Sequence, residues 1–122
     1  MKRVLIVDDA SVVRMLIKKV LTQADFEVVG EAVNGIDALV KYKELRPDLV
    51  TMDITMPEAD GIQATKDIIA FDAKAKVVML SGIDQKEMLW QAIKAGAVSY
   101  IVKPFENDRI LSTLNEVINT ET

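Results

Sequence analysis

The stretch VTMDITMP, residues 50–57, decides how this sequence is interpreted, because an apolar run ends there in a carboxylate. Asp53 closes the run, and a loop containing Pro57 follows it. Short apolar runs of this kind are typical of buried strands, so we expect Asp53 at the carboxyl end of one. Open α/β sheets bind and react with ligands at that edge. Asp53 is therefore the first candidate functional residue.

Two other apolar runs also end in charged residues. Residues 4–7 precede Asp8 and Asp9, and residues 100–102 precede Lys103. If the strands are neighbours, the carboxylates lie close together, and two like charges about 4 Å apart repel by roughly 4 kcal/mol at an effective dielectric near 20. A divalent cation relieves that repulsion, and an all-oxygen ligand set suits Mg²⁺. Taken singly, each aspartate could instead cap a helix or end a strand.

Lys103 is the expected cation of this cluster, able to pair with a carboxylate or a phosphoryl oxygen as a point charge. It can also be read as a surface lysine before a turn proline. Pro104 follows it, and an X-Pro bond can adopt the cis form that redirects a chain. Ser81 ends another apolar run and could donate its hydroxyl to the same anion.

Strand-like and helix-like segments alternate along the whole chain. We expect strands at residues 3–8, 26–29, 48–53, 76–81 and 98–102. Four of the intervening helices have candidate first-turn residues, and these are Ser11, Asn34, Asp60 and Asp84. Pro47 and Gly96 are expected to stop two helices. Five strands alternating with five helices predict an α/β fold with a parallel sheet covered on both faces.

Apolar residues recur at helical spacing in each helix and predict its inward face. The expected inward residues are Val12, Val13, Leu16, Ile17, Val20, Leu21, Ala38, Leu39, Tyr42, Ile62, Ile68, Ile69, Ile110, Leu111, Leu114, Val117 and Ile118. Residues 119–122 are expected to fray as a terminal tail.

Length, charge and composition narrow the functional classes. The 122 residues suffice for one domain with a proper core. A net charge of −4 gives no basic footprint for nucleic acid. The absence of cysteine and histidine excludes disulfides, thiolate chemistry and imidazole bases. No apolar run approaches a membrane span or a signal-peptide core, so we expect a cytoplasmic protein.

Several short motifs carry a resemblance to a known family: LIVDD at 5–9, MDITMP at 52–57, DG at 60–61, Ser81, GA at 96–97 and KPF at 103–105. In order and spacing they resemble the receiver domain of bacterial response regulators, over the whole chain. With no output domain attached, the sequence is most similar to single-domain chemotaxis regulators of that family. The resemblance implies one receiver domain over residues 1–122, with the flavodoxin-like, doubly wound strand order 2-1-3-4-5.

The resemblance implies a phosphoacceptor switch rather than an enzyme, with autocatalytic phosphorylation and self-dephosphorylation. Asp53 matches the residue that takes a phosphoryl group from a phosphohistidine of a sensor histidine kinase. Lys103 and Ser81 match the residues that act with it. Mg²⁺ is the implied cofactor, and the residues matching its site are Asp8, Asp9, Asp53 and the backbone carbonyl of Thr55.

The resemblance also implies how the signal leaves the domain. Ser81 and Tyr100 match a pair that switches together, although Tyr100 also fits an ordinary half-buried strand aromatic. The candidate partner face comprises Lys86, Leu89, Trp90, Lys94 and Tyr100. Trp90 could instead pack into the core beside Ile93. The expected partner of this monomer is the flagellar motor switch or a phosphatase, and no nucleic acid or membrane is expected to bind.

Other functions remain to be weighed. A phosphorelay intermediate of the sporulation type would need the same active-site residues. A magnesium-dependent aspartyl phosphatase would want an acid two residues after the nucleophile, where Thr55 stands. A flavodoxin-like cofactor binder would want a hydroxyl-rich loop where Asp8 and Asp9 stand. A Walker loop beginning at Gly30 lacks the lysine and hydroxyl after Gly35.

Overall fold

The computed structural model describes residues 1–56 and 60–119. Strands and helices alternate as β1 (Lys2–Val7), α1 (Ser11–Thr22), β2 (Phe26–Ala32), α2 (Gly35–Leu45), β3 (Leu49–Asp53), α3 (Gly61–Phe71), β4 (Val77–Ser81), α4 (Lys86–Lys94), β5 (Ser99–Val102) and α5 (Asn107–Asn119). Pro57 and most of the expected tail, residues 120–122, lie outside the described residues.

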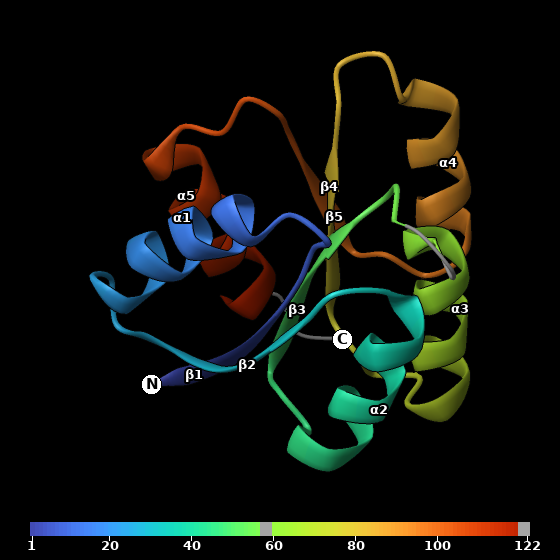
Figure 1. Cartoon of the computed structure of the whole chain (residues 1–122), viewed down its shortest axis with the longest axis horizontal. Helices are drawn as coiled ribbons and strands as arrows, with labels where there is room; N and C mark the ends of the chain where they lie inside the picture. The colour runs from blue at the N-terminus through green and yellow to red at the C-terminus, as the bar shows by residue number, and fades with distance from the viewer. Residues whose placement is uncertain (57–59, 120–122) are drawn as a thin grey trace.

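The five strands form one parallel sheet in the order β2-β1-β3-β4-β5. Figure 1 shows α1 and α5 on one face of the sheet and α2, α3 and α4 on the other. Buried side chains form one hydrophobic cluster on each side, as a sheet covered on both faces requires. The predicted fold class and strand order are confirmed.

Two of the four predicted helix starts are correct. Asn34 accepts a hydrogen bond from the Asp37 N–H at 2.8 Å, and Asp60 accepts one from the Gln63 N–H at 2.8 Å. Gly96 ends α4 with φ at +118°, a conformation that favours glycine. These residues act locally, so their pattern in the sequence is a sufficient guide.

The predicted caps at Ser11 and Asp84 are wrong. Ser11 is already the first residue of α1, and Ala10 takes the cap position without a side-chain hydrogen bond. The carboxylate of Asp8 organises this turn instead, because it accepts the Ala10 N–H at 2.9 Å. Asp84 lies in a turn before α4, whose cap position is held by Gln85.

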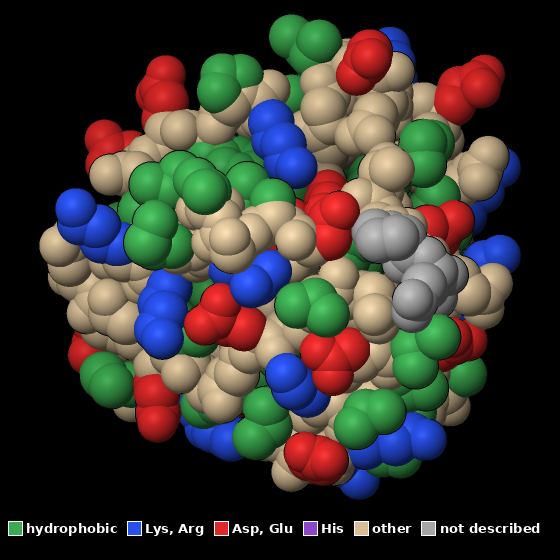
Figure 2. Space-filling view, viewed as in Figure 1, with side chains coloured by type: hydrophobic (Ala, Val, Ile, Leu, Met, Phe, Trp, Pro, Cys, Tyr) green, Lys and Arg blue, Asp and Glu red, His purple; other side chains and the backbone are tan. Residues whose placement is uncertain are grey.

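The predicted inward faces are buried or partly buried, with two exceptions on α1. Val12 and Leu16 are 60% and 56% exposed, because α1 buries only a narrow stripe that includes Ile17 and Leu21. Figure 2 shows apolar side chains gathered on the surface over α1 and α5. The apolar face predicted from these six positions is therefore wider than the face that α1 buries.

The lengths of the helices determine whether any of them could cross a membrane. The longest helix in residues 1–56 and 60–119 is α5, with 13 residues. A bilayer span needs roughly 20 apolar residues. Within these described ranges, no helix therefore meets the requirement for crossing a membrane.

Candidate functional site

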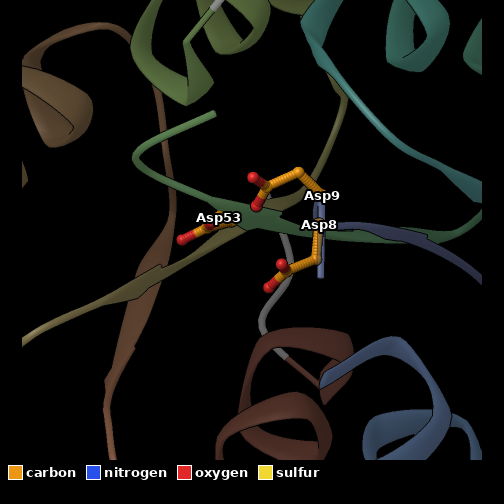
Figure 3. Close-up of side chains that lie close together, drawn as sticks. All are labelled: Asp8, Asp9 and Asp53. Carbon is orange, nitrogen blue, oxygen red and sulfur yellow. The ribbon is translucent and has the colours of Figure 1, made fainter. Parts of the chain in front are cut away.

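Three carboxylates meet at the carboxyl ends of β1 and β3. Val7 pairs with Met52 in the parallel register, so Asp8 and Asp53 leave adjacent strands at the same level. One carboxylate oxygen from each of Asp8, Asp9 and Asp53 lies within 4.8 Å of the others. Figure 3 shows the three side chains directed to the same side of the strand ends. The predicted convergence of these aspartates is confirmed.

Burial makes this cluster electrostatically unfavourable. Asp8 is 1% exposed and Asp53 is 6% exposed, whereas Asp9 faces solvent. Loss of hydration raises the pKa of Asp8, and the hydrogen bond from the Ala10 N–H opposes that rise. Burial first, and then repulsion from Asp8, raises the pKa of Asp53. Both carboxylates are therefore costly to hold as anions in the protein alone.

Lys103 supplies positive charge to the cluster, as predicted. Its Nζ lies 3.3 Å from Asp53 Oδ1 and 4.0 Å from Asp8 Oδ2. The Lys103 N–H donates to the Ser81 carbonyl at 2.8 Å, which extends the pairing of β4 with β5 and fixes the lysine at this edge. The Lys103–Pro104 peptide bond is cis. One ammonium group offsets only part of the charge of three carboxylates.

The donor set fits a hard divalent cation. Asp8 Oδ2 is buried and accepts no hydrogen bond from any residue that the structure describes. Buried polar atoms rarely lack a partner, so this oxygen is available to an ion. Carboxylate oxygens close together are the ligands that Mg²⁺ prefers. Thr55 lies two residues beyond Asp53, and its carbonyl stays a predicted ligand.

Arg14 is a supporting residue that the sequence pattern did not reveal. Its Nη1 donates to the Asp8 carbonyl at 2.7 Å and its Nε donates to Glu31 at 3.0 Å. Its side chain is 15% exposed, while Lys18, which also pairs with the Glu31 carboxylate, is 52% exposed and lies 3.7 Å away. Arg14 thus ties the β1 end to β2, but in sequence it is one basic residue among several on α1.

Gly61 explains part of the DG motif. A Cβ at this position would lie 2.0 Å from the carbonyl oxygen of Asp53. The Gly61 N–H donates to the Ile54 carbonyl at 2.8 Å. Only a residue without a side chain lets the start of α3 approach the end of β3 so closely. This glycine therefore lets α3 begin directly against the end of β3, where Asp53 lies.

A groove beside the carboxylate cluster brings together the predicted switch residues. Ser81, 1% exposed, and Tyr100, 49% exposed, both line a groove of about 360 Å³ between α4 and β5. The predicted partner-face residues Lys86, Leu89 and Trp90 line it as well. Trp90 is 61% exposed, so its alternative placement in the core is wrong. Lys94 is exposed on α4, outside this lining.

The family model and the relatives described here agree on the kind of protein that this chain resembles. The family model of the response regulator receiver domain matches residues 4–115. The chain is 55% identical to the chemotaxis protein CheY of Thermotoga maritima, over 95% of this chain and 97% of that protein. It is 56% identical to the chemotaxis protein CheY of Bacillus subtilis, over 96% of this chain and 98% of that one.

A solved structure of similar shape comes from the CheX-CheY-BeF₃-Mg²⁺ complex of Borrelia burgdorferi. It superposes with a TM-score of 0.92 at 33% sequence identity, over 98% of this chain and 90% of that one. The similarity therefore covers the sheet, the helices and the edge where the carboxylates meet.

Proposed function

The chain belongs to the response regulator receiver domain family, and from that premise we propose that Asp53 accepts a phosphoryl group from a sensor histidine kinase. The observation that supports this most directly is the meeting of Asp8, Asp9 and Asp53 beside Lys103, whose Nζ lies 3.3 Å from Asp53. The chain contains no histidine, so the phosphohistidine must belong to another protein.

In the proposed reaction, a carboxylate oxygen of Asp53 attacks the phosphorus atom of the donor. The bond from phosphorus to the imidazole nitrogen breaks, and its electron pair stays on that nitrogen. Phosphoryl transfer requires chiefly positioning and neutralisation of charge. Lys103 contributes one positive charge, and its place at the end of β5 keeps that charge against Asp53.

Asp8, Asp9, Asp53 and the Thr55 carbonyl are the residues that would hold Mg²⁺. The bound ion would neutralise charge on the carboxylates and on the phosphoryl oxygens. Asp8 Oδ2, buried and without a hydrogen bond among the described residues, supports this assignment. Arg14 assists indirectly by holding the Asp8 carbonyl at 2.7 Å.

The output side of the proposal is a shift between two populated states. A phosphoryl oxygen on Asp53 would draw the Ser81 hydroxyl toward it, and Tyr100 would turn into the groove that both residues line. The altered surface of α4, β5 and α5 would then bind a partner. The names of the two chemotaxis relatives support a role in chemotaxis, and the flagellar motor switch is the partner that we propose for that role.

A phosphatase is the second proposed partner, because the similar Borrelia burgdorferi chain is described in a complex with CheX, BeF₃ and Mg²⁺. Beryllofluoride mimics a phosphoryl group on a carboxylate. That complex supports the view that a receiver of this shape is recognised in its phosphorylated form. The sporulation-type relay, by contrast, finds no support in the two chemotaxis relatives described above.

The test is phosphorylation by a small donor. We expect acetyl phosphate and Mg²⁺ to add one phosphoryl group to the intact protein, measured by mass spectrometry. Asp53→Asn should prevent this addition, and EDTA should suppress it. Asp84→Asn, which removes an exposed carboxylate outside the cluster, is the matched control and should react normally. Phosphorylation of Asp53→Asn at the normal rate would refute the assignment.

Partner identity requires a separate experiment. The protein is immobilised with and without beryllofluoride and Mg²⁺, and candidate motor-switch and histidine phosphotransfer proteins are added in purified form. We expect the motor-switch protein to bind only the beryllofluoride form. Transfer of phosphate from Asp53 to a histidine phosphotransfer protein, without motor-switch binding, would favour the relay.

A further inference from the structure

The carboxamide of Gln85 joins two loops that border the site. Its Oε1 accepts a hydrogen bond from the Gly82 N–H at 2.6 Å. Its Nε2 donates to the Thr55 hydroxyl at 2.7 Å. Gly82 follows Ser81 at the end of β4, and Thr55 lies two residues after Asp53. One side chain therefore connects the loop that follows Ser81 at the end of β4 to the loop that follows Asp53 at the end of β3.

Gln85 itself is anchored from the other side. It holds the cap position of α4, and its carbonyl accepts the Leu89 N–H at 2.9 Å. Its own N–H donates to the Gly82 carbonyl at 3.2 Å, which closes a tight turn. The backbone from which the Gln85 side chain extends is therefore held at the start of α4. Any movement of Ser81 and Gly82 away from α4 must stretch or break the bond at Gly82.

Gly82 provides the space for this contact. A Cβ there would lie 3.4 Å from Gln85 Oε1 and 3.1 Å from Asp84 Oδ1. The glycine has no left-handed φ, since Gly96 is the glycine with positive φ among the described residues. The role of Gly82 is therefore room for the carboxamide and the Asp84 carboxylate, rather than a special backbone conformation.

From these contacts we infer that Gln85 is a latch that favours the unphosphorylated state, by tying the Ser81 loop to α4 and to Thr55. The inference rests on the proposed function, because movement of Ser81 toward Asp53 is what the latch opposes. Phosphorylation must overcome both hydrogen bonds before the groove between α4 and β5 can change shape. Gln85 is thus a positioning residue, and the strength of its two hydrogen bonds sets how readily the switch responds.

The expected change in beryllofluoride affinity follows from the number of hydrogen bonds that each substitution removes. A typical hydrogen bond contributes roughly a fivefold change in an equilibrium constant. Removing both bonds from the resting state alone should lower the ligand concentration needed to fill half the sites by about 25-fold, which is the product of two fivefold factors. Removing only the Thr55 bond should give a smaller change in the same direction.

The experiment compares Gln85→Ala and Thr55→Val with the unmodified protein, and uses Gln91→Ala as the matched control. Gln91 is an exposed glutamine on the same helix. Beryllofluoride is titrated in the presence of Mg²⁺, and binding is followed by the backbone amide signals of nuclear magnetic resonance spectra. The exchange rate of the Gly82 amide with water is measured in the same samples before beryllofluoride is added.

We expect faster Gly82 exchange and a lower half-saturation concentration in Gln85→Ala, an intermediate half-saturation in Thr55→Val, and no change in Gln91→Ala. Normal binding by the unmodified protein with an unchanged or higher midpoint in Gln85→Ala would overturn the latch and leave the proposed function standing. Absence of any beryllofluoride response in the unmodified protein would instead refute the proposed function. If Gln85→Ala does not fold, Thr55→Val decides the question by the same criteria.

Discussion

Replacing Asp8 with asparagine should stabilise the protein against unfolding when divalent cations are absent. Asparagine keeps an oxygen for the Ala10 N–H, which Asp8 Oδ1 now accepts at 2.9 Å. In place of Asp8 Oδ2 it puts an amide group that can donate to the neighbouring carboxylates. The substitution therefore removes one buried negative charge without removing the local hydrogen bond that shapes the turn.

The expected magnitude follows from the distances at the site. The Asp8 carboxylate has two like charges within 4.8 Å and one ammonium group at 4.0 Å. At an effective dielectric near 20, each of these contacts amounts to about 3 to 4 kcal/mol, so two repulsions outweigh one attraction. Solvent weakens the repulsion between Asp8 and the exposed Asp9, while burial of Asp8 adds a desolvation cost. We expect a net gain of about 1 to 3 kcal/mol.

The measurement is urea unfolding at neutral pH in EDTA and again in millimolar Mg²⁺. Mg²⁺ should stabilise the unmodified protein more than Asp8→Asn, because a ligand that binds only the folded state adds stability. The advantage of Asp8→Asn in EDTA should therefore shrink or reverse when the ion is present. Asp84→Asn serves as the control, since its exposed carboxylate lies outside the cluster.

The pH dependence has a definite sign. Burial raises the pKa of Asp8 above its ordinary value of 3.8, so the folded protein binds this proton more tightly than the unfolded chain. The free-energy cost of holding Asp8 ionised in the folded protein is complete above the raised pKa. This cost disappears as the pH falls through the raised pKa toward 3.8. The stability advantage of Asp8→Asn should fade across that window. A variant less stable than the unmodified protein in EDTA at neutral pH would refute this electrostatic reasoning.

Three further expectations concern supporting residues. Arg14→Met should weaken Mg²⁺ binding in calorimetry by freeing the Asp8 carbonyl, while Lys18→Met, which removes an exposed cation from the same glutamate, should not. Gly61→Ala should lower the unfolding free energy in urea by about 1 to 3 kcal/mol, because its Cβ would meet a backbone carbonyl. Thr51→Val should raise that free energy by up to about 1 kcal/mol, because the buried Thr51 hydroxyl has no hydrogen-bond partner among the described residues.

Most of the fold could be predicted because its signals are local and repeated. Apolar runs bounded by charged residues located the strands, and alternation with helical periodicity predicted the parallel sheet. Asn34 and Asp60 were correct as caps because such a residue bonds to a backbone amide three positions away. The strand order came from the family resemblance, since periodicity does not state which strands are neighbours.

The errors have a common physical origin. At the start of α1, the side chain that shapes the turn is Asp8, two residues before the cap, so the nearest hydroxyl at Ser11 was misleading. At α4, Gln85 holds the cap position while its side chain reaches Thr55, 30 positions away in sequence. Val12 and Leu16 are exposed because the contacts that α1 makes bury only the stripe of Ile17, Val20 and Leu21. Each case is decided by a contact that the local pattern does not contain.

The same distinction separates the two halves of the site. The carboxylates were found because they stand at the ends of two apolar runs, and a parallel sheet collects strand ends at one edge whatever the intervening sequence. Residues that act through another residue carry no such mark: Arg14 reaches across to β2, and Gln85 reaches across to Thr55 in the loop after β3. The phosphoryl-transfer site that we propose is therefore apparent from the sequence, whereas the latch that we infer depends on side chains of ordinary type in particular places. Differences in switching between close relatives should accordingly map to residues such as Gln85, rather than to the aspartates themselves.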